Sequence, residues 1–361
     1  MQLDMHYYGT YAMARAAGLK TDAAKSIATA AQFVDDNANK DSVEFRDGAR
    51  LDAEASAHHA VDKKNIDPED QRKIWVPFHF LPGNEGDSFT ERLICRKNSR
   101  IAGEMLEFVL SNSKQHYALP LAGIAAHVYA DTFSHYGFSG VSSRRNKVDN
   151  KSFKFYELNS AMKTYIERKR SKFEEEYHKE GGLLTNIKSW IAETFSGALG
   201  HGAVMTFPDR PYLKWSFEYE NPKAESGIRD NQVTFLEGCE ALHGFFRKFA
   251  GLREDLAESG FMEFGAIRDD IEHIIGLQAP KQDRINAWKH AASAGKLFAE
   301  GDEAIPDYDQ NTWHNQRDNL TRSKISEAAI EQDIYKFYQA ASVFRNYILR
   351  ILLPSKGLVV T

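Results

Sequence analysis

The chain has 361 residues, of which 42% are hydrophobic and 12% aromatic, and its formal net charge is −5. This length allows one large domain or two ordinary ones, and the net charge excludes the globally basic composition typical of nucleic-acid binding. Two cysteines are too few for a disulfide framework or a thiolate zinc site. The sequence has no run of 18 apolar residues and no signal-peptide pattern, so we expect a cytoplasmic protein without a transmembrane segment.

Helical periodicity dominates the chain. The best strand signal, at residues 74–81, is interrupted by Pro77, so we expect an extended loop there. We therefore predict an all-α fold, a multi-helix bundle with few or no strands. The predicted helices cover residues 21–34, 99–110, 121–140, 152–177, 183–195, 232–257, 281–299 and 325–352.

The most informative segment is 121–140, in which His127, Asp131 and His135 stand four residues apart in turn. Each step of four advances a helix by about 40° beyond a full turn, so the three side chains lie on one face. Polar groups on an Ala-rich, apolar helix need partners, because burying them unpaired is costly. Two divalent cations with Asp131 between them would satisfy all three side chains and predict a buried metal site. The alternative is a buried hydrogen-bond network.

Two carboxylates at the end of the first predicted helix are candidate ligands. Asp35 and Asp36 face the negative end of the helix dipole, which is unfavourable unless a cation lies nearby. The alternative is an ordinary turn that starts a loop. His6 precedes an Ala-rich segment and is expected to point into the same core, although a surface position is the alternative.

Further candidates come from loops and from a pair of adjacent histidines. Glycines on both sides of His201 allow close backbone approach, and Asp209 follows in a Pro-Asp-Arg-Pro turn. Adjacent helical residues point about 100° apart, so one residue of the His58–His59 pair is expected to face a site, and we favour His59. For His79, which lies among aromatic residues and prolines, a role in the core or a substrate wall is as plausible as a metal ligand.

The Ala-rich helix with the pattern G-x-x-x-H-x-x-x-D, followed shortly by another histidine, resembles the core of the zinc-dependent phospholipase C and single-strand nuclease superfamily. The motifs HYYGTYAMARAAG, AAQFVDDN, PFHFLPG and LGHG…PDRP resemble an uncharacterised bacterial family near that superfamily. The resemblance covers residues 1–215 and implies an all-helical protein that holds up to three zinc ions. The implied metal ligands, in chain order, are His6, Asp35 or Asp36, His59, His127, Asp131, His135, His201 and Asp209.

The sequence also departs from the superfamily pattern. Secreted members use the amine of the mature N-terminus as a ligand, whereas this chain starts with Met1 and has no signal pattern. The interval between Asp131 and His135 is shorter than is usual for the superfamily, and Met205 stands where a carboxylate would follow His201 by one helical turn. The resemblance therefore predicts that one metal site is altered or missing.

These features predict a metal-dependent hydrolase that cleaves a phosphodiester in a phospholipid or a nucleic acid. Histidine and aspartate ligands suit zinc, with manganese or iron as alternatives. Asp35 or Asp36 is the expected catalytic carboxylate that orients the attacking water. Two alternatives stay open: a helical interaction module with a structural metal, and an HD-like nucleotide phosphohydrolase, although the chain has no His-Asp dipeptide.

The segment 221–231 is the most linker-like part of the chain. It predicts a metal-binding helical domain at 1–220 and a C-terminal helical extension at 221–361, with a single domain as the alternative. The extension is a candidate surface for a homo-oligomer or a protein partner. Residues 144–172 contain ten Lys or Arg against three Asp or Glu, which suits a phosphate-bearing ligand, although a solvated helix is the simpler interpretation.

Overall fold

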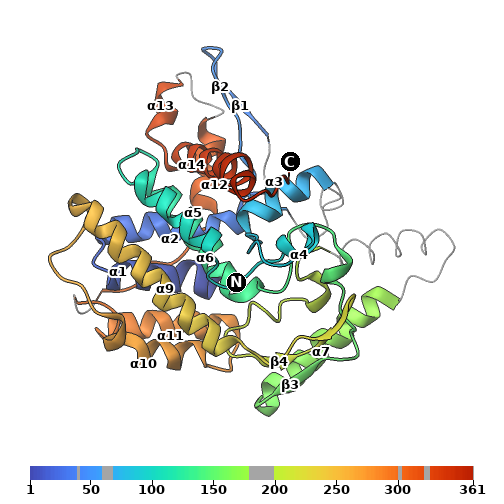
Figure 1. Cartoon of the computed structure of the whole chain (residues 1–361). Helices are drawn as coiled ribbons and strands as arrows, with labels where there is room; N and C mark the ends of the chain where they lie inside the picture. The colour runs from blue at the N-terminus through green and yellow to red at the C-terminus, as the bar shows by residue number, and fades with distance from the viewer. Residues whose placement is uncertain (39–40, 59–67, 179–198, 300–302, 321–325, 361) are drawn as a thin grey trace.

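The computed structural model describes residues 1–38, 41–58, 68–178, 199–299, 303–320 and 326–360. The predicted mostly helical fold is confirmed, and the described strands are two or three residues long. The long helix α6 (Ala118–His135) is buried at the centre, with four other helices packed against it (Figure 1). These four are α2 (Thr21–Asp36), α5 (Arg100–Ser111), α9 (Asn231–Leu252) and α14 (Asp333–Tyr347).

Helices α2 and α6 pack very closely because Gly123 has no side chain. A Cβ atom at this position would lie 2.3 Å from the carbonyl oxygen of Ile27 and 2.5 Å from the Cβ of Ala30. The close approach allows His127 of α6 to reach the backbone of α2, where its Nδ1 lies 2.8 Å from the carbonyl oxygen of Ala31. The C-terminal turn of α2, which carries Asp35, is therefore held beside α6.

The N-terminal segment is buried, and the chain begins near the middle of the molecule (Figure 1). It forms a π-helix (Asp4–Gly9) followed by α1 (Thr10–Ala16). A buried ion pair anchors it, because Asp4 Oδ2 accepts a 2.6 Å hydrogen bond from Arg284 Nε of α11 (Lys281–Ser293). This anchor fixes the position of the first residues of the chain relative to α6.

The large hydrophobic core is continuous across residue 220, because it contains residues from Met1 to Val360. Segment 221–231, the most linker-like part of the sequence, contributes β6 (Lys223–Glu225) and β7 (Arg229–Asp230). The remaining C-terminal helices are α10 (Phe264–Ile275), α12 (Asn311–Leu320), α13 (Glu327–Ile330), a π-helix (Ile348–Leu352) and α15 (Leu353–Ser355).

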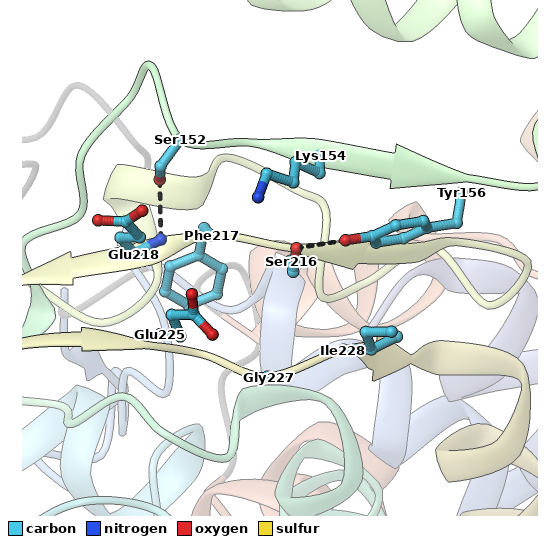
Figure 2. Close-up of a pocket in the computed structure, with 9 residues that line it drawn as sticks. All are labelled: Ser152, Lys154, Tyr156, Ser216, Phe217, Glu218, Glu225, Gly227 and Ile228. Atoms are coloured by element: carbon cyan, nitrogen blue, oxygen red, sulfur yellow. Dashed lines mark hydrogen bonds between the residues drawn. The ribbon is translucent and has the colours of Figure 1, made fainter.

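A second, smaller core lies under a three-stranded antiparallel sheet, in the order β3 (Lys154–Tyr156), β4 (Lys214–Ser216) and β7. Trp215 and Phe207 fill it, together with Ile166 of α7 (Ser160–His178). Hairpin strand β5 (Glu218–Glu220) pairs with β6 beside this sheet. Figure 2 shows a small pocket on these strands, where the Tyr156 and Ser216 hydroxyl groups lie 2.9 Å apart.

Several predicted elements need correction. Residues 74–78 belong to α3 (Pro68–Phe78) and not to an extended loop; Pro77 lacks the N–H that a helical residue donates, and the helix ends at the next residue. The helix predicted at 152–177 begins only at Ser160, since 154–156 pair with β4 as strand β3. The helix predicted at 183–195 lies outside the described residues.

Two further short elements are α4 (Phe89–Arg92) and the hairpin of β1 (Val43–Glu44) and β2 (Arg50–Leu51). The hairpin projects from the body of the molecule (Figure 1). Among the described helices, each falls short of the length or hydropathy that a bilayer span requires.

Candidate metal centre

Three groups of histidine and carboxylate side chains meet where α2, α6 and the segment after residue 200 come together. Within each group, the possible ligand atoms lie within 4.8 Å of one another. The first two groups share His127, and His135 of the third lies 3.4 Å from Asp131 of the first, so the three groups are neighbours. The groups are His6, His127 and Asp131; Asp35, His79 and His127; and His135, His201 and Asp209.

Asp131 lies between these groups and is completely buried. Its Oδ1 is 3.2 Å from His6 Nε2, and its Oδ2 is 3.2 Å from His127 Nε2. The same Oδ2 lies 3.5 Å from His79 Nδ1 and 3.4 Å from His135 Nδ1. The spacing of four residues on α6 therefore places its three polar side chains on one face, as predicted, with the carboxylate in the middle.

The amine of Met1 also reaches this carboxylate. Its nitrogen lies 2.6 Å from Asp131 Oδ1 and 3.3 Å from Asp209 Oδ1. Burial alone lowers the pKa of this amine, but the charges of Asp131, Asp209 and Asp35 outweigh burial and raise it to about 11. In this structure the amine is thus the cation that balances the buried carboxylates.

Backbone carbonyl groups orient four of the imidazole rings. In each ring one nitrogen lies against a carbonyl oxygen, so that nitrogen carries the proton and the other faces the cluster. This arrangement is typical of metal-binding histidines, whose second nitrogen is held by a backbone or carboxylate acceptor. The pairs are His79 with Ser56 (2.9 Å), His127 with Ala31 (2.8 Å), His135 with His79 (2.9 Å) and His201 with Met205 (2.7 Å).

Some buried polar atoms in the cluster have no hydrogen-bond partner among the described residues. They include both ring nitrogens of His6 and Oδ2 of Asp131, whose contacts are close but lack hydrogen-bond geometry. Buried polar atoms are nearly always paired, so unsatisfied ones need an explanation such as an ion. Imidazole nitrogens and carboxylate oxygens together are a donor set that zinc, manganese or iron accepts, so the residues fit a metal centre.

The protonation states of His6, His201 and Asp131 favour ligation, whereas for His127 burial lowers the pKa but the charges of Asp131 and Asp35 outweigh burial and raise it. Burial, together with the charges of His127 and the N-terminal amine, lowers the pKa of His6 to about 3. Burial likewise lowers the pKa of His201 to about 4. Burial opposes the ionised form of Asp131, but His135, the amine and His127 keep its pKa well below the usual value. Near neutral pH His6 and His201 are therefore neutral and the Asp131 carboxylate is charged, as metal ligands must be.

The cluster is open on one side. The side chain of Asp35 is 34% exposed and that of His201 is 18% exposed, whereas Asp131 and His127 are fully buried. A closed site would be typical of a structural metal, and an accessible position is typical of a catalytic one.

Most of the predicted ligands lie in the three groups, but Asp36 does not. His6, Asp35, His127, Asp131, His135, His201 and Asp209 come together in the three groups. Asp36 does not join them: one helical position after Asp35, it points elsewhere and accepts a 2.6 Å hydrogen bond from the Tyr308 hydroxyl. Burial and the charge of Asp35 raise the pKa of Asp36. Of the two alternatives that the sequence offered, Asp35 and not Asp36 lies in the cluster.

Two further histidines differ from the residues above. His59, predicted as a ligand, lies outside the described residues. His79, which the sequence left undecided, lies in the second group with Asp35 and His127. The only signal for His79 in the sequence was an imidazole among aromatic residues, and that pattern fits a core residue equally well.

The chain belongs to a family of unknown function, DUF6765, which it matches over residues 1–352. The match includes every candidate ligand and the C-terminal helices up to the last π-helix. No curated protein and no solved structure matches the chain.

Proposed function

We propose that this protein is a metal-dependent hydrolase that cleaves phosphodiesters. The observation that carries the proposal is the position of Asp131, whose two oxygens face ligands of all three histidine and carboxylate groups. Adjacent ions that share such a carboxylate are a common feature of enzymes that cleave phosphate esters. The resemblance to zinc-dependent phospholipases C and single-strand nucleases, noted in the sequence, supports the same conclusion.

The residues that would hold two or three divalent ions are the members of the three groups, with zinc as the first candidate. Such ions supply an activated water and neutralise the charge that develops on the phosphoryl group. The chain itself contributes orientation, because backbone carbonyls hold four rings in fixed directions. Asp35, the most exposed of the candidate ligands, is placed to accept a hydrogen bond from an attacking water and to take its proton.

Hydrolysis of bis(p-nitrophenyl) phosphate by the purified chain tests the proposal. We expect activity that a chelator abolishes and that added Zn²⁺ restores. His127→Ala should be inactive while retaining its helical circular dichroism signal. The matched control is His243→Ala, which changes another buried histidine whose Nε2 contacts the Met262 carbonyl oxygen outside the cluster. Equal activity in the two variants, or activity that survives complete chelation, would contradict the proposal.

A further inference from the structure

A pocket of about 320 Å³ lies directly beside the candidate metal centre. Two of its lining residues are chain neighbours of groups in the centre, and a third follows a residue that contacts the centre. Gln2 follows Met1, Arg210 follows Asp209, and Thr206 follows Met205, whose carbonyl oxygen lies against His201. Because consecutive Cα atoms are about 3.8 Å apart, the backbone of Gln2 lies next to Met1 and the backbone of Arg210 lies next to Asp209. The pocket and the centre are therefore adjacent.

The pocket has a positively charged lining. Arg210, Lys169 and Lys281 contribute three cations, and no acidic residue lines it. Lys169 belongs to the basic segment 144–172, and Lys281 is the first residue of α11, where the positive end of the helix dipole lies. Burial raises the pKa of Tyr165, but the hydrogen bond and charge of Arg210, together with Lys169, outweigh it and lower that pKa.

Arg210 is the central group of this pocket. It is only 7% exposed, and within the described part of the chain it forms no ion pair. Its Nη2 lies 3.1 Å from Thr206 Oγ1 and its Nη1 lies 3.4 Å from the Tyr212 hydroxyl, which are both neutral partners. Its Nε is buried and has no hydrogen-bond partner among the described residues. A buried guanidinium without an anion is costly, so its charge points to a ligand that supplies one.

The three positive charges that line the pocket favour a phosphate group as its ligand. A phosphate monoester carries about −1.5 to −2 near neutral pH, which matches three cations better than a single carboxylate does. The planar fork of arginine also suits phosphate oxygens. The volume leaves room for part of the group to which the phosphate is esterified, because it lies at the lower end of the range for small-molecule pockets.

We propose that this cavity, the Arg210 pocket, binds a phosphate monoester group. In a second step that rests on the proposed function, this group is an additional phosphate of the substrate whose scissile phosphodiester lies at the metal centre. Substrates with a second phosphate near the cleaved bond are then favoured over those without one.

Calorimetric titration of the full chain with inorganic phosphate and with glycerol 3-phosphate tests the pocket, on the protein as purified and again after chelation. The test variant is Lys169→Glu/Lys281→Glu, which changes two exposed side chains of the pocket. The control is Lys163→Glu/Lys248→Glu, which makes the same charge change at exposed positions outside the pocket. Arg210→Met provides a second test of the buried cation.

We expect the test variant to bind glycerol 3-phosphate at least about tenfold more weakly than the control, because charged hydrogen bonds and ion pairing are lost. Arg210→Met should show the same loss. Equal binding by the test and control variants would overturn the proposal. Binding of inorganic phosphate without glycerol 3-phosphate would overturn the assignment to an esterified group. If the chain hydrolyses no phosphodiester but the test variant still loses binding, the proposed function fails while the pocket stands.

Discussion

Two of the regions that supply ligands to the candidate metal centre are built differently. His127 and Asp131 lie on α6, a helix whose own hydrogen bonds fix their spacing and whose close packing against α2 brings Asp35 to them. His201 and Asp209 lie in a segment of turns instead, beside the smaller core. The helical region therefore determines its ligand geometry locally, whereas the turn region depends on anchors from distant parts of the chain.

Asn231 is the main anchor of the turn region. Its side-chain amide nitrogen lies 2.8 Å from both the Phe207 and the Arg210 carbonyl oxygens, on either side of Asp209. The two regions should therefore respond differently to substitution. A substitution in the turns should leave the helical ligands in place, whereas a substitution in α6 should displace the ligands of both regions.

The largest expected effect comes from Asp131→Asn, because this carboxylate contacts His127 directly and is linked to the turn region through His135, whose Nε2 lies 3.1 Å from Asp209 Oδ1. We expect the rate on bis(p-nitrophenyl) phosphate to fall by at least about a thousandfold, since groups that act as a unit lose nearly all activity together. Circular dichroism provides the folding control. A folded variant with more than a tenth of the wild-type rate would show that the regions do not share this carboxylate functionally.

Asp209→Asn should damage only the turn region. We expect metal content to fall by about one ion per chain and the rate to fall by roughly a hundredfold, while the helical ligands keep their ions. Inductively coupled plasma mass spectrometry and steady-state kinetics measure the two quantities. Loss of all metal from this variant would mean that the two regions bind ions only together.

Asp35 and Asp36 form a matched pair at the end of α2. Asp35→Asn should weaken metal binding by about 10- to 100-fold, because it removes a carboxylate of the second group. Asp36→Asn should change metal affinity less than threefold, because it affects mainly the hydrogen bond from Tyr308. Competition with a zinc-binding dye measures both, and reversed effects would contradict the assignment of Asp35.

Gly123→Ala tests the close packing on which the helical region depends. A methyl group here would overlap backbone and side-chain atoms of α2, so we expect a loss of about 1–3 kcal/mol in unfolding free energy. Gly103→Ala in α5 is the control, since a Cβ there meets nothing within 4 Å and alanine favours a helix. Urea denaturation measures both. Equal stability of the two variants would count against tight contact between α2 and α6.

The last expected effect concerns the pH dependence of stability in the metal-free chain. Folding lowers the pKa of His6 from 6.5 to about 3 and that of His201 to about 4, chiefly through burial. The unfolded chain therefore binds more protons below pH 6.5, and stability present above that pH is lost as the pH falls toward 4. Each histidine contributes up to about 1.4 kcal/mol per pH unit.

Urea midpoints of the chelated protein between pH 7 and 4.5 measure this loss. His201→Gln, which cannot be protonated in this range, should show a shallower decline than the wild type. A midpoint that does not change with pH in the wild type would be inconsistent with buried, neutral imidazoles.

The sequence predicted the central helix well because an uninterrupted apolar pattern with polar groups every four residues has one simple interpretation. Helix α10 also carried a signal, with Ile267, Ile271 and Ile274 on one face, but it was not predicted. Strand β3 could not be found in this way, because three residues become a strand only by pairing with β4, 60 residues later. Local patterns therefore determine the helical region far more than the sheet region.

The candidate site shows the same contrast between residues that a local pattern identifies and residues that only the folded chain brings together. The ligands on α6 were predicted from their spacing, and Asp35 from its place at a helix end. His79 was left undecided because its role depends on where α3 ends relative to α6, which no local pattern records. The Met1 amine is a backbone group, so side-chain motifs do not indicate that it contacts Asp131.

Anomalous X-ray diffraction at the zinc edge, from crystals of the full chain grown with Zn²⁺, tests the central claim most directly. The account predicts at least two peaks beside Asp131, with one carboxylate oxygen about 2.0–2.2 Å from an ion and the imidazoles of His127 and His135 among the ligands. Well-ordered, zinc-saturated crystals with no peak near Asp131 would contradict it.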